Sequence, residues 1–216
     1  LRFAPAPTGF LHLGSARTAL FNWLYARHTG GELVLRVEDT NAELASSEFI
    51  DNIYRSLEWL GIDWDGEPVR QSERAGMYDE AVETWLADGR AYLDEGAVRF
   101  RVPDTGTTGW DDIVRGRVEF ENEHLEDFVV RRSDGSATFF VANAVDDLDL
   151  GITHVVRGED LVNVTPKVLL LREALGADDV PEFAHLPLIV NEARKKLSKR
   201  RDDVALESYR DRGVLA

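Results

Sequence analysis

The first 39 residues constrain the fold most, because two apolar strand-like stretches flank one helical stretch. LRFAP (1–5) predicts a short buried strand that ends at proline, and ELVLRVED (32–39) predicts a second strand. The second stretch is almost continuously apolar up to Arg36, which is typical of a strand buried on both faces of a parallel sheet. Between them, PTGFLHLGS is a turn rich in proline and glycine. This order predicts a βαβ unit.

The segment ARTALFNWLYARHT predicts the helix of this unit. Ser15 is the expected N-cap, and Gly30 and Gly31 are the expected stop signal. The face expected to be buried consists of Ala19, Leu20, Trp23 and Leu24.

Further along, the chain alternates helical and strand-like segments around a β-rich region. We expect helices near 44–60 and 74–89, strands within 97–141, and a hairpin turn at SDGS between two of those strands. A strand in GITHVVRGED, a helix from Thr165-Pro166 to about Ala174, a buried strand in FAHLPLIV and a short helix in ALESYRDRG follow. The expected fold class is α/β: a Rossmann-like doubly wound parallel sheet with a β-rich insertion.

Charge and composition narrow the classes of function that are open to the chain. The formal net charge is −15, yet RKKLSKRR (194–201) holds six basic side chains in eight positions. The acidic total argues against a protein that coats nucleic acid, but it permits a local phosphate site. There are no cysteines, which excludes disulfides and Cys-ligated zinc in this chain. No apolar run approaches the roughly 20 residues that span a bilayer, and we expect a cytoplasmic protein without membrane contact.

The turn before the first helix is the first candidate site. His12 and Gly14 lie where the first strand passes to the helix, and ligands of open α/β sheets bind in that crevice. Free N–H groups at a helix N-terminus favour anions there. Alone, a His two residues before a Gly is weak support for a phosphate site, and a simple capping histidine is the commoner reading.

Two motifs that are distant in the sequence together make the functional prediction for this turn more specific. RFAPAPTGFLHLGSARTALFNWLYARHTGGELVLRVEDTN resembles the start of class I glutamyl-tRNA synthetases, with HLGS in the place of their HIGH motif. KLSKR (196–200) is similar to their KMSKS loop. The stretches between, from DFVVRRSDGS to REALG and then EFAHLPLIV, follow the second half of that catalytic fold in order and spacing.

The resemblance implies an ATP-dependent ligase. Its reaction joins L-glutamate to the 3′ end of tRNA(Glu) through a glutamyl-adenylate, with Mg²⁺ brought in on the ATP phosphates. No zinc is expected, because the chain has no cysteine. The resemblance implies a monomer divided into a first catalytic half (1–89), an insertion that binds the tRNA acceptor end (90–137), a second catalytic half (138–201) and the start of a stem-contact region (202–216).

The same resemblance assigns roles to individual residues. The expected catalytic group consists of His12, Gly14, Lys196, Ser198 and Lys199. ATP binding is expected at Thr8, Gly9, His12, Gly14, Asp160 and Lys199. The glutamate pocket is expected to contain Arg2, Ala4, Ala6, Glu38, Phe139, Asn143 and Arg157, with the two arginines facing the side-chain carboxylate and Glu38 facing the ammonium. Four arginines are expected to contact tRNA: Arg115, Arg117, Arg131 and Arg132.

The chain departs from its family in three places. Many relatives have Ser at the position of Ala6 and Tyr at that of Phe139, and both changes remove a hydroxyl from the expected pocket. After Tyr92 the chain is shorter than in most relatives. The two pocket changes put the orientation of the substrate in doubt and leave the class of reaction as it is. Three alternative functions also stay open: a glutamyl-queuosine tRNA(Asp) synthetase, a non-catalytic RNA- or nucleotide-binding paralogue, and a nucleotidyltransferase.

Overall fold

The chain forms two compact units. The computed structural model describes residues 1–41, 45–191, 194 and 205–214. The first unit comprises Leu1–Ser72, Val156–Asp160 and His185–Ala216, and the second comprises Glu73–Val155 and Leu161–Ala184. The fourfold division expected from the sequence remains a prediction.

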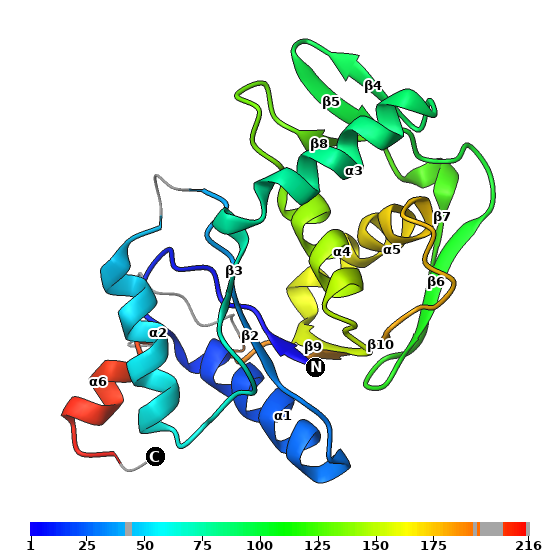
Figure 1. The fold of residues 1–216 in the computed structure, drawn as a ribbon. Coiled ribbons are helices and arrows are strands. Elements are labelled where there is room, and N and C mark those ends of the chain that lie inside the picture. The colour runs from blue at the N-terminus through cyan, green and yellow to red at the C-terminus, as the bar shows by residue number, and fades with distance from the viewer. Residues whose placement is uncertain (42–44, 192–193, 195–204, 215–216) are drawn as a thin grey trace. The chain divides into compact units, whose positions relative to one another are not determined.

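The first unit contains the expected βαβ arrangement (Figure 1). Its elements are β1 (Arg2–Phe3), α1 (Leu13–Thr29), β2 (Val34–Val37), α2 (Ser47–Trp59), β3 (Val69–Arg70) and α6 (Leu206–Asp211). β1 pairs in parallel with β2, and β2 pairs in parallel with β3, so the parallel sheet is confirmed. The core of this unit packs Phe3 and Leu35 of the sheet with Ala19 of α1 and Leu57 of α2.

Helix α1 begins two residues before the expected cap. His12 is the N-cap, because its Nδ1 accepts a hydrogen bond of 3.1 Å from the backbone N–H of Ser15. The prediction that Ser15 caps the helix was therefore wrong, because the helix starts at Leu13 and the N–H of Ser15 is itself the donor that the imidazole satisfies. The predicted stop is confirmed: Gly30 has φ 69°, and its N–H donates to the carbonyl of Ala26.

The buried face of α1 also differs from the prediction. Leu20 and Leu24 are 41% and 48% exposed, whereas Ala19 is buried as expected and Trp23 is half-buried. The buried residues of α1 are Ala16, Ala19, Asn22 and Ala26. Small side chains at this spacing let a helix backbone approach its neighbours closely, so size decided the buried face here and hydrophobicity did not.

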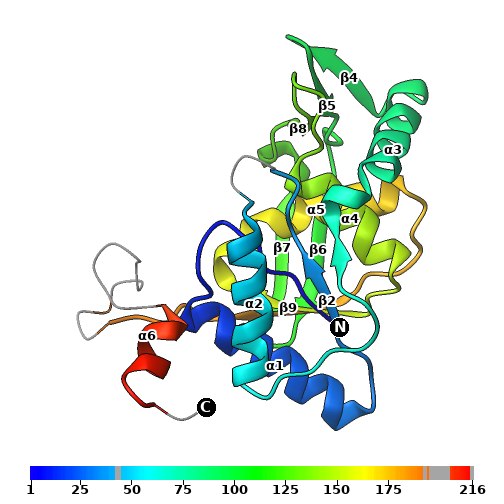
Figure 2. The ribbon, with the colours of Figure 1, turned by 60° about the vertical axis from the view of Figure 1, so that its left-hand side comes forward.

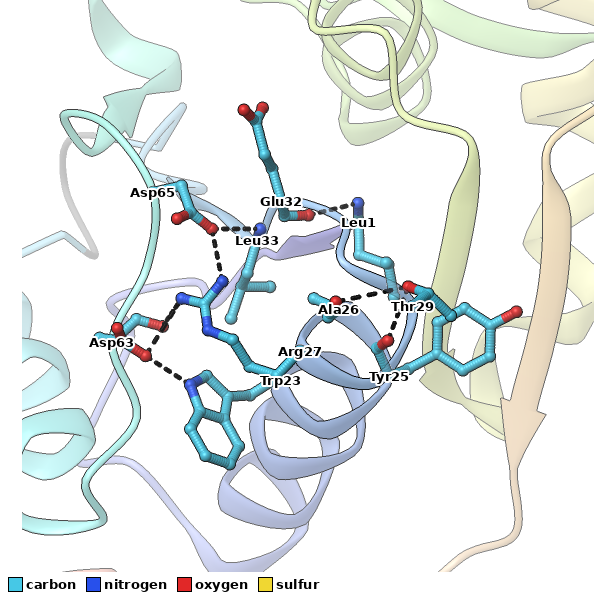
Figure 3. A network of polar contacts seen from close by, with 10 residues as sticks. All are labelled: Leu1, Trp23, Tyr25, Ala26, Arg27, Thr29, Glu32, Leu33, Asp63 and Asp65. Carbon is cyan, nitrogen blue, oxygen red and sulfur yellow. Dashed lines mark hydrogen bonds and ion pairs between the residues drawn. The ribbon is translucent and has the colours of Figure 1, made fainter.

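A polar network ties the end of α1 to the start of β2 and to the loop after α2 (Figure 3). Arg27 Nη1 donates to Asp65 Oδ2 at 2.9 Å, and the N–H of Leu33 donates to the same oxygen at 2.8 Å. The hydrogen bond from Arg27 is the largest influence that holds the pKa of Asp65 below its ordinary value, followed by that from Leu33. Trp23 donates its indole N–H to Asp63, which also pairs with Arg27.

The second unit combines helices with antiparallel strands. Its elements are α3 (Ala75–Ala87), β4 (Ala91–Asp94), β5 (Ala97–Phe100), β6 (Thr107–Asp112), β7 (Gly116–Glu121), β8 (Phe128–Arg131), α4 (Phe139–Asp149) and α5 (Thr165–Ala174). β9 (His154–Gly158) and β10 (Glu182–Leu186) begin in this unit and end in the first. Short 3₁₀ turns span Gln71–Glu73, Asn122–His124 and Glu159–Val164.

The β-rich region does not form one separate sheet. β4, β5 and β8 make an antiparallel sheet, whereas β7 and β6 join β10 and β9 in the order β7-β6-β10-β9. β6 is antiparallel to β7 and parallel to β10. Strands of the expected insertion therefore extend the sheet that contains the late strands of the α/β fold.

The segment after the SDGS turn is helical. The expected second strand of that hairpin is reduced to one bridge between Arg131 and Ala137, and α4 begins at Phe139. Every residue from 141 to 147 is buried in the helix, so the prediction of a strand here was wrong. An apolar run such as FFVANAV suits a buried helix as well as a buried strand, and tertiary packing chose the helix.

Candidate functional site

The turn between β1 and α1 places His12 across the start of the helix. Its ring lies beside Ser15, with Nε2 3.2 Å from Ser15 Oγ. Gly14 leaves room for this ring, because a Cβ at that position would lie 3.2 Å from His12 Cε1 and Nδ1. Thr8 and Gly9 belong to the loop that enters the turn, where the N–H of Thr8 donates to the carbonyl of Ala6 at 2.9 Å.

The chain returns to this turn immediately after the basic segment. Ala205 forms an antiparallel bridge with His12, and the N–H of Leu206 donates to the carbonyl of Leu11 at 2.9 Å. Figure 2 shows α6 next to the start of α1. The structure thus joins the HLGS turn to the residues that directly follow 195–204. Lys196, Ser198 and Lys199 themselves lie outside the described residues.

The segment that leads into the basic stretch is also held by the first unit. Arg17 of α1 donates from Nη2 to the carbonyl of Pro187 at 2.6 Å. The N–H of Leu188 donates to Glu159 Oε1 at 2.8 Å. The entry at Pro187–Leu188 and the exit at Ala205 are therefore both attached near α1 and the end of β9.

Two of the expected glutamate ligands lie on, or directly after, neighbouring parallel strands. Arg2 is a buried residue of β1, and Glu38 directly follows β2. The N–H of Glu38 donates to the carbonyl of Pro5 at 3.0 Å, which holds the two strand ends together. Arg36 lies within 3.1 Å of the Glu38 carboxylate through its Nη2. Of the two alanines expected here, Ala4 is half-buried and Ala6 is exposed.

Arg157, the third charged residue of the expected pocket, has a partner that the sequence did not suggest. It is buried near the end of β9, and its Nε donates to Nε2 of His185 at 3.1 Å. His185, on β10, is fully buried. Because that ring nitrogen accepts a hydrogen bond, it carries no proton, and the imidazole is neutral with its proton on Nδ1. Asp160 follows β9, and its side chain folds against Gly158.

Asp39 is a second residue that sequence reasoning missed. Its buried carboxylate accepts hydrogen bonds from Nε and Nη2 of Arg70 at 2.9 and 2.7 Å. It also accepts from the N–H and the hydroxyl of Ser72, both at 2.8 Å. Burial acts to raise the pKa of Asp39, but the hydrogen bonds from Ser72 and Arg70 outweigh it and hold the pKa below its ordinary value. The residue next to Glu38 is thereby bonded to Arg70 at the end of β3 and to Ser72.

The remaining expected ligands belong to the second unit. Phe139 is the first residue of α4, and Asn143, one turn later, is buried and donates to the carbonyl of Phe139 at 3.1 Å. The four expected tRNA contacts, Arg115, Arg117, Arg131 and Arg132, lie on or beside β7 and β8.

Three of these arginines have clear partners. Arg117 pairs with Glu119 at 2.7 Å, and Arg131 pairs with Glu83 at 2.6 Å. Arg132 instead donates to the uncharged Ser136 hydroxyl and Ala137 carbonyl.

Within the described part of the chain, no three His, Cys, Asp or Glu side chains gather as a metal site would require. None of the described helices has the length and apolar character needed to cross a membrane.

Comparison with known proteins defines the class to which this fold and site belong. The sequence family described as "tRNA synthetases class I (E and Q), catalytic domain" matches residues 1–97 and 94–216. The chain therefore belongs to this family of class I tRNA synthetases, and the expected α/β catalytic fold is confirmed. The two matched segments meet at the β4–β5 hairpin.

Relatives of known name agree on one member of that class. A glutamate–tRNA ligase from Frankia casuarinae is 52% identical over 248 aligned positions, which cover 100% of this chain and 53% of the relative. One from Oleidesulfovibrio alaskensis is 46% identical, covering 99% of this chain and 54% of that protein. The crystal structure of a glutamate tRNA ligase from Elizabethkingia meningosepticum, in complex with its amino acid, superposes with a TM-score of 0.82. That match has 35% identity and covers 92% of this chain and 51% of the other. The chain spans about half the length of these relatives.

Proposed function

We propose that this chain is the catalytic part of an enzyme that ligates L-glutamate to the 3′ end of tRNA(Glu), using ATP. The observation that carries the proposal is the pairing of His12 with Ala205. It brings the residue that directly follows 195–204 to the HLGS turn, and a class I synthetase needs its two signature motifs close together. The names of the relatives supply the amino acid and the tRNA.

The first step is formation of glutamyl-adenylate from MgATP. An oxygen of the glutamate α-carboxylate attacks the α-phosphorus, and the bond to the bridging oxygen breaks, so that pyrophosphate leaves with the electron pair. Charge accumulates on the phosphate oxygens in the transition state, and positioned cations and N–H donors lower the barrier. In this proposal His12 and the N-terminus of α1 face the phosphates, while Lys196 and Lys199 supply positive charge. Ser198 assists by hydrogen bonding.

Recognition of glutamate needs opposite charges at its two ends. Arg2 and Arg157 are the proposed partners of the side-chain carboxylate, since a guanidinium can bind a carboxylate through two parallel hydrogen bonds. Glu38 is the proposed partner of the ammonium group. Arg36 Nη2 contacts the Glu38 carboxylate at 3.1 Å. Ala4 and Ala6 are further proposed members of this pocket, whereas Phe139 and Asn143 remain predictions from the family resemblance.

The second step transfers the glutamyl group to tRNA. A hydroxyl of the terminal ribose attacks the carbonyl carbon of the adenylate, and AMP leaves with its phosphate. Thr8, Gly9, Gly14 and Asp160 are proposed to hold the nucleotide through this step. The arginines of β7 and β8 are proposed to contact the acceptor end. A monomer and a cytoplasmic location belong to the same proposal.

Pyrophosphate exchange into ATP tests the function and separates it from the alternatives. We expect glutamate-dependent exchange that requires tRNA(Glu), as the family resemblance implies. Exchange without tRNA would favour the glutamyl-queuosine tRNA(Asp) synthetase. If neither condition supports exchange, both ligase readings are wrong and a binding paralogue is favoured.

A lysine variant tests the role of the basic segment. Replacing Lys199 by Ala should lower the rate of exchange by roughly a hundredfold while glutamate binding changes little, because its charge acts on the leaving phosphates. Lys195→Ala removes an equal charge four positions away and is the matched control. Equal rates in the two variants would remove Lys199 from the mechanism.

A further inference from the structure

Asn52 links three segments that are distant in sequence. It lies in α2, and only 1% of its surface is exposed. Its Oδ1 accepts a hydrogen bond of 2.8 Å from the backbone N–H of Leu11. Its Nδ2 donates to Glu207 Oε1 at 2.6 Å. One amide side chain thus contacts the residue before His12 and the second residue of α6.

The chemistry of this link requires an amide. The N–H of Leu11 needs an acceptor, and the carboxylate of Glu207 needs a donor. Aspartate would offer acceptors to both partners, and leucine would offer nothing to either. An asparagine satisfies both in one orientation only, with its oxygen toward Leu11 and its nitrogen toward Glu207.

The link lies beside the junction of the two signature segments. Leu11 also accepts from the N–H of Leu206 at 2.9 Å, and His12 bridges Ala205. The side chains of Leu11 and Leu206 are buried in the core of the first unit. Asn52 therefore adds a polar connection to a contact otherwise made by two backbone segments and the two apolar side chains of Leu11 and Leu206.

We propose that Asn52 and Glu207 are positioning residues that fix the exit of the basic segment relative to His12. They act through Leu11 and Ala205–Leu206 and do not touch the reacting groups. Displacement of catalytic groups by about 1 Å can lower a rate roughly a hundredfold, so a buried link at this position has a functional consequence. The expected change in rate rests on the proposed function. The expected change in the position of Ala205–Leu206 rests on the described contacts.

Swapping the amide of Asn52 and the carboxylate of Glu207 tests the inference. Asn52→Asp places a carboxylate against Glu207 and should lower kcat for ATP–pyrophosphate exchange by roughly ten- to a hundredfold, with KM for glutamate changed little. Glu207→Gln keeps an acceptor for Asn52 Nδ2 and should have a small effect. The double variant N52D/E207Q restores one acid facing one amide with the hydrogen bond reversed, and it should recover most of the lost rate.

The control is the adjacent Asp51→Asn, an exposed position on the same helix with the same pair of side-chain types. It should leave the rate unchanged. A loss of rate in N52D that the double variant does not recover would show that the contact with Glu207 is not its cause. A lower melting temperature with unchanged kcat would show that the link serves only stability, and either result would overturn the inference.

A second measurement does not depend on activity. Hydrogen–deuterium exchange at the amide of Leu206 should accelerate in N52D and return toward the wild-type rate in N52D/E207Q. Unchanged exchange at Leu206 would contradict the inference even in an active enzyme. If the wild-type chain showed no pyrophosphate exchange, the proposed function would fail while this measurement still tested the link.

Discussion

At the scale of single residues, the contact between Arg157 and His185 carries a prediction. Replacing His185 by Ala leaves the buried Nε–H of Arg157 without this acceptor, which costs about 1–3 kcal/mol. We expect KM for glutamate to rise roughly tenfold or more, since Arg157 is the proposed carboxylate ligand. Gln can present an oxygen at a similar position and should recover part of the affinity. His28→Ala removes an exposed imidazole from α1 and is the control. Equal KM values for wild type and H185A would contradict the role of His185.

Asp39 carries a residue-scale prediction about pH. Its folded-state pKa is depressed, so its contribution to stability is fully present above the unfolded pKa of about 4 and is lost as pH falls through the lower folded value. Asp39→Asn should lower stability by about 2 kcal/mol at pH 7, because two charge-assisted bonds to Arg70 are weakened. The difference between wild type and D39N, measured by thermal denaturation, should shrink below pH 4. A difference that stayed constant down to pH 2 would contradict this assignment.

At the scale of elements, the β4–β5 hairpin lies where the two segments matched by the family meet. Its two-residue turn consists of Glu95 and Gly96, with φ of 49° and 85°. Both values lie in the left-handed region, which favours Asn followed by Gly. Glu95→Asn should therefore stabilise the chain by a few tenths of a kcal/mol, and Gly96→Ala should destabilise it by about 1–2 kcal/mol. Gly76→Ala in α3, where a Cβ meets nothing within 4 Å, should be neutral or stabilising. Chemical denaturation of the three variants measures these differences, and a G96A variant as stable as wild type would exclude this turn geometry.

At the scale of the whole molecule, the net charge of −15 must be reconciled with tRNA, the polyanionic partner that we propose. Carboxylates already pair with Arg117 and Arg131, whereas the hydrogen bonds of Arg132 are to uncharged groups. We expect Arg132→Ala to weaken tRNA binding several-fold and to lower the salt dependence by about one counterion. Arg117→Ala should change binding less, because its charge is already compensated. Filter binding across a salt series measures both, and the opposite ranking would contradict the assignment.

Local sequence was enough to predict most elements, and the long-range contacts explain where it failed. Pro166 at the start of α5 and Gly30 after α1 act through their own backbone geometry, so both were predictable. FFVANAV could form a buried strand or a buried helix, and only packing in the second unit selected α4. Likewise, Leu20 and Leu24 match a helical repeat but lie on the exposed side of α1.

The sequence by itself determined the family, the glycine turn with His12, and the chemical types expected at the site, because these depend on residue identity and order. Tertiary structure alone decided which segments meet there. It paired Ala205 with His12, gave Arg157 the neutral imidazole of His185, and placed Asn52 between Leu11 and Glu207. These contacts join residues far apart in the chain, and no local propensity encodes them. They form because a buried polar group without a hydrogen bond costs free energy, so each one is paired with a group that folding brings close to it.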